Sequence, residues 1–268
     1  MAAPFLKWVG GKRQLLGAIT TRVPSEVGGT YWEPFVGGAA LFFALEKQGR
    51  IQKAVLCDAN PDLIETFRCV RDEPEALIRA LRRHRNDEEH FYGVRALKPA
   101  SLSPVQRAAR FILLNRCGYN GLYRVNSRGE FNVPFGRYVN PKICDQDNIR
   151  AASRALQIAD LRHADFEDAA AAKRRDFVYF DPPYVPLTKT ASFTAYVRQG
   201  FGPDDHARLR TLALRLKSRG VGFLLSNSST AEVRALYSEG FTLETVDARR
   251  LINCQPSGRK SVPELLIQ

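Results

Sequence analysis

The chain has 268 residues, and its 44% hydrophobic and 25% charged content is typical of a globular protein with one sizeable core and an inserted or small second domain. Its formal charge of +12 at pH 7 makes nucleic acid the first partner to consider, ahead of a membrane surface, although basic faces also occur without such a partner. No signal peptide or long apolar run is present. We therefore expect a soluble, cytoplasmic monomer with no membrane partner.

The cysteine and histidine patterns exclude several classes of site. The five cysteines are scattered and contain no C-x-x-C pair, which argues against a disulfide framework and against structural zinc. The four histidines, at positions 84, 90, 163 and 206, do not have metal-ligand spacing. We expect a reducing compartment and no bound metal.

The chain opens with residues 5–12, FLKWVGGK, followed by a helical pattern from about residue 12. An aromatic ring, two glycines and two lysines beside a helix start could hold a charged, partly aromatic cofactor. A plain glycine loop before a helix is the alternative. Residues 31–41, YWEPFVGGAAL, then read as strand, glycine turn and helix, which is the first unit of a Rossmann-like fold.

A second strand is predicted over residues 54–57 and ends at Asp58, twenty residues after Gly38. An acid at this place binds ribose hydroxyls in such folds. Alternatively, Asp58 caps the helix that begins at Asn60 and Pro61. Both roles are compatible, because caps and ligand contacts share this end of a sheet.

The middle of the chain is helical and then basic. Residues 60–98 have a helical, charged pattern, and Ser103, Pro104 and Gln106 form a strong helix start. From residue 107 to 142 there are seven basic residues and one acid, interleaved with aromatics and asparagines, and residues 127–129 suggest a hairpin tip. Arginine and asparagine read base edges and other basic groups suit phosphates, so this stretch predicts DNA binding. A basic, glycine-rich surface loop is the alternative.

Residues 176–184, DFVYFDPPY, are the most informative stretch. Four apolar residues, 177–180, predict a strand buried on both faces, and the two prolines force the chain to turn after Asp181. Asp181 and the carbonyl of Pro182 could accept both N–H bonds of a nucleobase amino group and so localise its lone pair. Tyr184 offers a face on which an extruded base could stack. A proline turn capped by Asp181 is the alternative interpretation.

The remaining pattern returns to the sheet. Residues 145–156 and 203–219 are predicted helices, and residues 158–161 and 221–227 are predicted strands. Residues 241–246 and 262–267 are predicted to form a final strand pair. The predicted fold class is α/β, a Rossmann-like core with an inserted, mostly helical domain containing a β-hairpin. We assign residues 1–60 and 143–268 to the core and residues 61–142 to the insertion.

The DPPY stretch resembles motif IV of amino-methyltransferases, and residues 35–39 resemble their motif I (F-x-G-x-G), with Ala39 in place of the last glycine. Together with residues 5–12 and 119–138, these segments resemble the Dam family (D12 class, group α) of DNA adenine-N6 methyltransferases, from Phe5 to about Leu266. The resemblance implies a Rossmann-like S-adenosylmethionine-dependent core and a target-recognition domain. It implies methylation of a flipped-out adenine in double-stranded DNA, with GATC as the expected site.

The resemblance also implies roles for single residues. Catalysis would fall to Asp181, Pro182 and Tyr184. The cofactor S-adenosyl-L-methionine would be bound by Trp8, Lys12, Phe35, Gly37, Asp58, Asp165 and Asp181, although Asp165 could equally be only a helix cap. DNA would be contacted by Lys7, Tyr119, Asn120, Leu122, Arg124, Pro134, Arg137 and Tyr138. Residues 192–196 resemble the segment beside the target base.

Three rival interpretations stay open at this point. The first is methylation of cytosine N4, and the second is methylation of adenine in another sequence or in RNA. The third is a DNA-binding regulator that keeps the fold without the activity. Cytosine-C5 methylation is disfavoured, because its nucleophilic cysteine typically sits in Pro-Cys and none of the five cysteines follows a proline.

Overall fold

The computed structural model describes residues 1–8, 10, 12–185, 201–249 and 261–268. Its centre is a seven-stranded sheet with the strand order β3-β2-β1-β4-β5-β7-β6. The first five strands in that order are parallel, and β7 is antiparallel to both β5 and β6. The strands are β1 (Tyr31–Glu33), β2 (Ala54–Asp58), β3 (Ala159–His163), β4 (Phe177–Phe180), β5 (Gly222–Ser228), β6 (Leu243–Arg249) and β7 (Ser261–Ile267).

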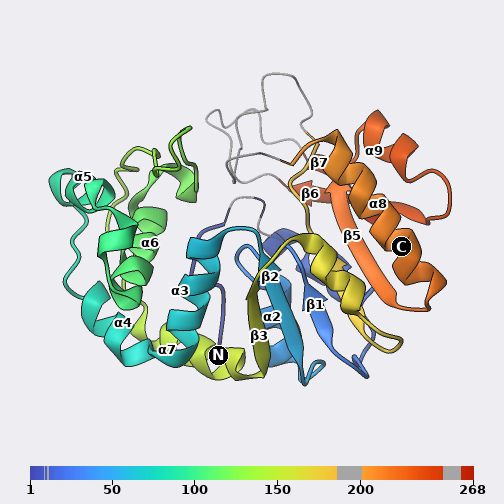
Figure 1. Ribbon diagram of the computed structural model, residues 1–268, viewed down its shortest axis with the longest axis horizontal. Helices are drawn as coiled ribbons and strands as arrows, with labels where there is room; N and C mark the ends of the chain where they lie inside the picture. The colour runs from blue at the N-terminus through green and yellow to red at the C-terminus, as the bar shows by residue number, and fades with distance from the viewer. Residues whose placement is uncertain (9, 11, 186–200, 250–260) are drawn as a thin grey trace.

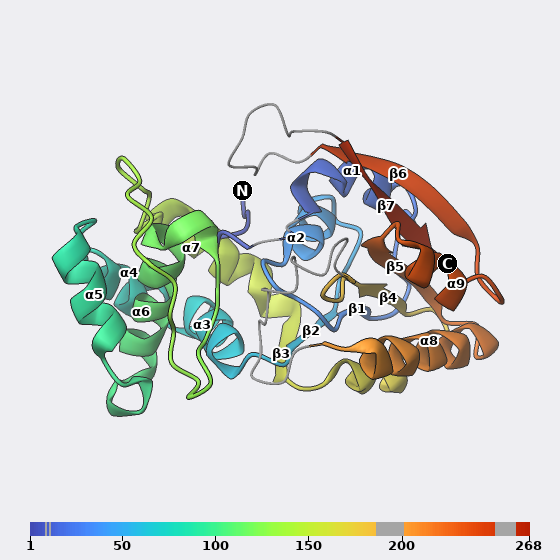
Figure 2. The same cartoon turned by 90° about the horizontal axis from the view of Figure 1, so that it is seen from above.

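Helices cover both faces of this sheet (Figures 1 and 2), which confirms the predicted Rossmann-like α/β core. The α-helices are α1 (Leu16–Thr20), α2 (Ala40–Lys47), α3 (Pro61–Asp72), α4 (Pro74–Leu81), α5 (Glu88–Ala96), α6 (Pro104–Cys117), α7 (Gln146–Ala155), α8 (Pro203–Ser218) and α9 (Ala231–Leu236). Short 3-10 helices are η1 (Lys12–Gln14), η2 (Pro99–Ser101), η3 (Tyr119–Gly121), η4 (Leu156–Ile158) and η5 (Phe166–Ala171).

The central strand β4 is buried on both faces, as its unbroken apolar run predicts. Side chains alternate across a strand, so Tyr179 packs into the core on the α1–α2 side and Val178 and Phe180 into the core on the α8 side. Figure 2 shows α8 on one side of the sheet and α1 and α2 on the other. The residue after β4, Asp181, therefore lies at the carboxyl end of a central strand, between two packed layers.

The helical region from α3 to α6 extends the molecule beyond β3, on the side opposite β6 and β7 (Figure 1). α3 joins this region to the sheet, because Arg68 and Arg71 donate to the Leu161 and Ala159 carbonyls of β3 at 2.8 and 2.9 Å. Phe67 of α3 and Ile112 of α6 belong to the same hydrophobic cluster as strand residues of the core. The helical region and the sheet are thus packed through one continuous apolar layer.

Two local predictions for this region can be compared with the structure. The capping box at the start of α6 is confirmed, since Ser103 and Gln106 each bond the other's backbone N–H. The predicted hairpin tip is a turn closed by a single antiparallel bridge between Val125 and Phe131, without regular strands on either side. The Asn126 side chain supports this turn by accepting from the N–H groups of Arg128 and Glu130, both at 3.0 Å.

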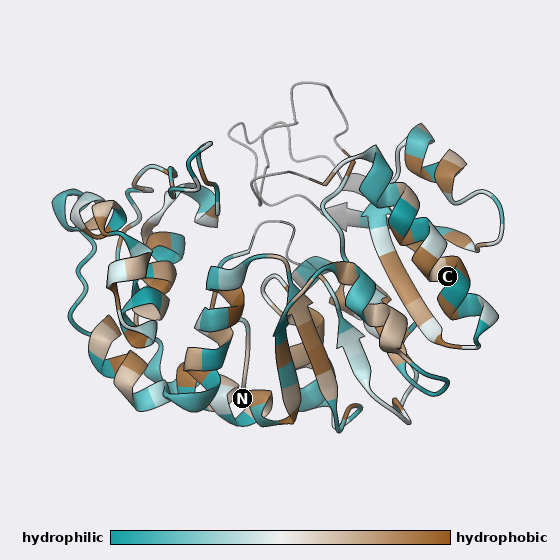
Figure 3. Ribbon diagram, in the orientation of Figure 1, coloured by the Kyte–Doolittle hydropathy of each residue, from teal (hydrophilic) through white to brown (hydrophobic). Residues whose placement is uncertain are grey.

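β2 and the first part of β5 are mostly apolar, whereas apolar and polar residues alternate around α3 and α8 (Figure 3). This is the pattern of strands covered by amphipathic helices. Within the described ranges, no helix is both long enough and apolar enough to cross a membrane.

Candidate active site

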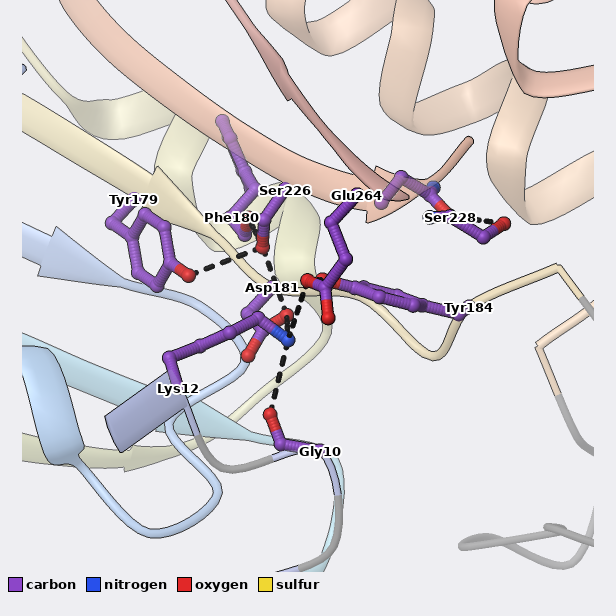
Figure 4. A network of polar contacts seen from close by, with 10 residues as sticks. Gly10, Lys12, Tyr179, Phe180, Asp181, Tyr184, Ser226, Ser228 and Glu264 are labelled. Carbon is purple, nitrogen blue, oxygen red and sulfur yellow. Dashed lines mark hydrogen bonds and ion pairs between the residues drawn. The ribbon is translucent and has the colours of Figure 1, made fainter. Parts of the chain in front are cut away.

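A buried polar network lies at the carboxyl end of β4 (Figure 4). The Lys12 ammonium is 2.8 Å from Asp181 Oδ1 and donates to the Gly10 carbonyl at 3.0 Å. Ser226, near the end of β5, donates to the same Asp181 oxygen at 2.9 Å. Lys12 comes from the amino-terminal segment and Ser226 from the neighbouring strand, so the fold brings both to one side of a single carboxylate.

The number of hydroxyl hydrogens decides which group is the donor in each hydrogen bond of this network. A hydroxyl has one hydrogen, and an ionised carboxylate only accepts, so Ser226 gives its hydrogen to Asp181. The Tyr179 hydroxyl, 3.1 Å from Ser226 Oγ, is then the donor to the serine oxygen. Tyr179 and Ser226 are buried, and their hydrogen bonds restrain the orientation of the Asp181 carboxylate, whose side chain is 21% exposed.

The protonation of Asp181 is set by opposing effects. Burial raises its pKa above the ordinary value for an aspartate, and the charge and hydrogen bond of Lys12, with the hydrogen bond of Ser226, lower it. A neighbouring carboxyl, Glu33 at the end of β1, is fully buried and accepts from Tyr31 at 2.8 Å. Burial raises the pKa of Glu33 to about 8, so Glu33 is mostly neutral at pH 7 and adds little negative charge beside Asp181.

Tyr184 lies beside this carboxylate, beyond the buried Pro182. Its hydroxyl donates to Glu264 Oε2 at 2.5 Å, and the Lys12 ammonium lies 4.3 Å from the centre of its ring. The ring is therefore held at its edge by a carboxylate and on one face by a cation. The predicted catalytic residues Asp181, Pro182 and Tyr184 are thus gathered in one place, together with Lys12.

A second cluster lies at the ends of β1 and β2. Asp58 accepts from the backbone N–H of Gly37 at 3.2 Å and of Asn60 at 3.0 Å. Burial raises the pKa of Asp58 to about 6, and these two hydrogen bonds oppose the rise. The cap of α3 is Asn60, whose side chain accepts from the N–H groups of Asp62 and Leu63. Asp58 therefore faces the glycine turn rather than capping the helix.

The glycine turn also packs closely against Trp8. A Cβ on Gly37 would lie 2.7 Å from two atoms of the Trp8 ring, and Gly37 has a φ of +45°. Glycine is required here by the indole, which forms a wall of the cluster around Asp58. Ala39 at the start of α2 also has positive φ, 55°, at the position where the motif has its last glycine. Phe35 stacks on Phe166 with 5.5 Å between the ring centres.

Asp165 lies outside the Asp181 network but next to the Asp58 cluster, because the N–H of the preceding residue, Ala164, donates to the Asp58 carbonyl at 3.2 Å. It caps η5 by accepting from the Glu167 N–H at 3.0 Å, and it pairs with Arg208 of α8 at 3.1 Å. Its side chain is 54% exposed. This geometry shows the capping role that the sequence left open for Asp165, and none of its partners belongs to the Asp181 network.

The predicted DNA contacts surround the end of α6. The Lys7 ammonium lies 3.6 Å from the centre of the Tyr138 ring and donates to the Arg116 carbonyl at 3.2 Å. Burial lowers the pKa of Lys7, and the positive charge of the nearby Arg116 lowers it further. Buried Asn115 holds the Lys7 backbone, accepting from its N–H at 2.8 Å and donating to its carbonyl at 2.6 Å, and it also donates to the Gly121 carbonyl at 3.2 Å.

The other predicted DNA contacts lie on the loop that follows. The Tyr119 N–H donates to the Pro134 carbonyl at 2.9 Å, which ties the two ends of the loop together. Arg124 donates to the Asn132 side chain at 2.8 Å, and Arg137 is 3.5 Å from Glu88 and 78% exposed. Asn120, inside η3, has a left-handed backbone, and Leu122 directly follows η3. The loop thus presents two arginines and an exposed tyrosine beside the Lys7–Tyr138 pair.

One predicted feature, the segment 192–196, falls outside the described residues. In the described part of the chain, no three His, Cys, Asp or Glu side chains are placed to hold a metal ion. The sequence analysis did not single out Ser226, Glu264 or Asn115. A polar residue at the end of the buried β5 was a usable signal for Ser226, whereas Glu264 depends on strand pairing that the sequence does not show.

Comparison with known proteins gives a consistent result over nearly the whole chain. The family of D12 class N6 adenine-specific DNA methyltransferases matches residues 8–252. The type II methyltransferase M1.LlaDCHI of Lactococcus lactis is 42% identical over 98% of this chain and 94% of its own length. The type II methyltransferase M.MjaIII of Methanocaldococcus jannaschii is 41% identical over 98% of both chains. The DNA adenine methylase of Vibrio cholerae is 37% identical over 98% of this chain and 94% of its own length.

These likenesses span both the sheet, with its network around Asp181, and the helical region with its basic loop. On this evidence the chain belongs to the D12 class of N6 adenine-specific DNA methyltransferases.

Proposed function

We propose that this enzyme transfers a methyl group from S-adenosylmethionine to N6 of an adenine that is flipped out of duplex DNA, and that its recognition site is GATC. The observation that carries the proposal is the Asp181 carboxylate, which lies at the sheet edge with its Oδ1 already bound by Lys12 and Ser226. Oδ2 is then the oxygen that can accept an incoming N–H. Residues 1–60 and 143–268 would form the catalytic part and residues 61–142 the target-recognition part.

The residues of the site support a simple division of labour. Asp181 Oδ2 accepts one N–H of the adenine amino group and the Pro182 carbonyl accepts the other, so the nitrogen lone pair is localised for attack. Pro182 and Pro183 restrict the backbone, which keeps these acceptors in place before the base arrives. Tyr184 offers the free face of its ring for stacking. An extruded base would thus be hydrogen-bonded along its edge and stacked on one face.

The cluster around Asp58 fits the proposed cofactor. When bound, S-adenosylmethionine supplies a methyl carbon made electrophilic by its positive sulfur. The buried Asp58 carboxylate suits ribose hydroxyl donors, and the Trp8 indole beside Gly37 gives an aromatic wall for a flat or cationic group. Phe35 adds a further ring close to the end of β1. The Lys12 ammonium already pairs with Asp181. It would therefore bind the carboxylate of the cofactor only while also keeping this ion pair.

The basic loop supports the DNA part of the proposal. Lys7 and Tyr138 are packed together beside Arg116, and Arg124 is held in one orientation by Asn132, so these groups are preorganised for base edges. Arg137, exposed and weakly paired with Glu88, suits a phosphate. The proposed choice of GATC rests on the similarity of this loop and of Lys7 to the DNA adenine methylases. The related type II methyltransferases make another site the main rival.

One incubation tests the reaction and the site together. The purified enzyme is given methyl-labelled S-adenosylmethionine and four duplexes: one with GATC, one with GATC methylated on one strand, one with GATC methylated on both strands, and one with GTTC. We expect label only in the first two duplexes, recovered as N6-methyladenine after digestion to nucleosides. Label in GTTC or in the fully methylated duplex would contradict the GATC proposal, and label in N4-methylcytosine would contradict the adenine target.

A variant then tests the chemistry. Asp181→Asn keeps the size of the side chain but removes the charge and one acceptor, so we expect the turnover number to fall by about 100-fold or more. Asp147→Asn, at an aspartate that is 91% exposed on α7, is the matched control and should retain normal turnover. Normal turnover of Asp181→Asn would exclude the proposed role of this carboxylate.

A further inference from the structure

Glu264 reaches the site from β7, which is antiparallel to both of its neighbouring strands. Because β7 runs antiparallel to β5, its early residues lie at the edge where β4 and β5 end. Glu264 is paired in register with Ser228, two residues after Ser226. Its side chain, 18% exposed, points into the space between Asp181 and Tyr184 (Figure 4).

The contacts of Glu264 bear on both neighbours. Its Oε2 accepts the hydrogen bond of the Tyr184 hydroxyl at 2.5 Å and lies 3.8 Å from the Lys12 ammonium, which pairs with Asp181. We propose that Glu264 is a positioning residue of the methyl transfer, and that its carboxylate fixes the plane of the Tyr184 ring on which the target adenine stacks. Glu264 itself touches neither substrate nor cofactor in this role.

The physical reason is the freedom of the tyrosine ring. A stacking platform works only if the ring keeps one orientation, and a tyrosine side chain can rotate about two bonds. The hydrogen bond from a phenol to a carboxylate is charge-assisted and short, and it restrains the end of the ring that lies farthest from the backbone. Because the Lys12 ammonium lies near one face of the ring, the base would stack on the opposite face.

The inference rests on the proposed stacking role of Tyr184, and it predicts a specific pattern of variants. Glu264→Gln keeps an acceptor oxygen at the same distance, whereas Glu264→Met keeps the length without any comparable acceptor. We expect kcat/KM for duplex DNA to fall about tenfold for Glu264→Met, which corresponds to ~1.4 kcal/mol, and to stay within about threefold of wild type for Glu264→Gln. The KM for S-adenosylmethionine should be unchanged in both.

A double-mutant cycle separates positioning from general packing. Tyr184→Phe already lacks the hydroxyl that Glu264 binds, so adding Glu264→Met to it should cause almost no further loss. Glu244→Ala on the neighbouring strand β6, where Glu244 pairs with Arg22, is the control for a lost glutamate outside the site and should keep full activity. Melting temperatures of all variants show whether each is folded. If Glu264→Met does not fold, Glu264→Asp withdraws the acceptor while keeping the charge, and we expect the same tenfold loss.

Any of three results would overturn the inference. The first is a folded Glu264→Met enzyme as active as wild type, and the second is a Glu264→Gln enzyme as impaired as Glu264→Met. The third is full additivity of Glu264→Met and Tyr184→Phe. A wild-type enzyme that methylates no duplex at all would instead remove the proposed function, so the two failures are distinguishable.

Discussion

Asp181 shows how the surroundings of one residue set its chemistry. Burial favours its neutral form, and the Lys12 ammonium and the Ser226 hydroxyl favour the ionised form that can accept an N–H. The raised pKa means that activity should be lost on acidification at a higher pH than for an exposed aspartate. The groups that interact with this carboxylate include Lys12, Tyr31, Tyr179, Tyr184, Ser226, Glu33 and Glu264.

The first prediction concerns Lys12. Lys12→Met removes the charge that opposes burial, so the pKa of Asp181 should rise further and the acidic side of the kcat profile should move to higher pH. The measurement is kcat against pH at saturating cofactor and DNA. Lys47→Met, at an exposed lysine that ends α2, is the control and should leave the profile in place. A profile of Lys12→Met that stays put or moves to lower pH would show that Lys12 does not govern this carboxylate.

The second prediction concerns Asp58, whose pKa is raised to about 6 by burial. If the ionised carboxylate accepts ribose hydroxyls, S-adenosylmethionine should bind more weakly as the pH falls through 6. At pH 5 about a tenth of Asp58 is ionised, so the dissociation constant should rise about tenfold from its value at pH 7.5. Calorimetry at the two pH values checks this. Asp58→Asn should bind weakly at both, and a pH dependence that survives this substitution would point to another group.

At the scale of elements, the turn between β1 and α2 departs from the glycine motif. Ala39 has a left-handed backbone and is fully buried. That backbone costs about 1–2 kcal/mol for a residue with a Cβ, and burial of its methyl group returns about 0.8 kcal/mol. Burial thus offsets a large part of the backbone cost, which explains how alanine is tolerated at this position.

The third prediction follows from this balance. Ala39→Gly should change the free energy of unfolding by less than about 1 kcal/mol, and a change should favour the folded state. Ala39→Val should be clearly destabilising, because a β-branched residue rarely adopts this backbone. Denaturant unfolding of the three proteins measures both effects. A large loss of stability in Ala39→Gly would mean that the methyl group packs more tightly than this balance assumes.

The fourth prediction concerns the link between α6 and the amino-terminal segment. Asn115→Ala leaves the backbone groups of Lys7 and Gly121 without their buried partner, so stability should fall by about 2–4 kcal/mol. Gln157→Ala removes an amide that also donates to two carbonyls, but on an exposed surface, and should cost under about 1 kcal/mol. Equal losses for the two variants in denaturant unfolding would show that burial does not decide the contribution.

The whole molecule carries a formal charge of +12, and its DNA affinity should depend strongly on salt. The fifth prediction is that Arg137→Ala weakens binding on all sequences and lowers the slope of log affinity against log salt by about one. Arg85, equally exposed and paired with Asp87, is the matched control outside the predicted contacts and should leave the slope unchanged as Arg85→Ala. Arg124→Ala should instead reduce discrimination between GATC and altered sites. A uniform loss for Arg124→Ala would argue against base reading.

The sequence by itself determined the elements and the class of chemistry. The unbroken apolar run at residues 177–180 is an unmistakable strand, because strands buried on both faces need apolar residues throughout, and residues 223–225 form a shorter apolar run in β5. Ser103 and Gln106 mark a helix start through local bonds alone. The Asp-Pro-Pro-Tyr stretch directly after such a strand indicated that the site lies at the carboxyl end of the sheet. Its residue types indicated chemistry on an amino group. The monomeric state and the individual roles of the site residues stay predictions.

Only the tertiary structure decided which distant groups surround that stretch. Ser226 and Glu264 reach Asp181 and Tyr184 through the pairing of β4, β5 and the antiparallel β7, and the direction of β7 cannot be read from its own residues. Asn115 likewise acquires its role from Lys7, which lies 108 residues away in the chain. Local patterns report what a residue can do, whereas hydrogen bonds and buried charges depend on neighbours that folding supplies from far along the chain.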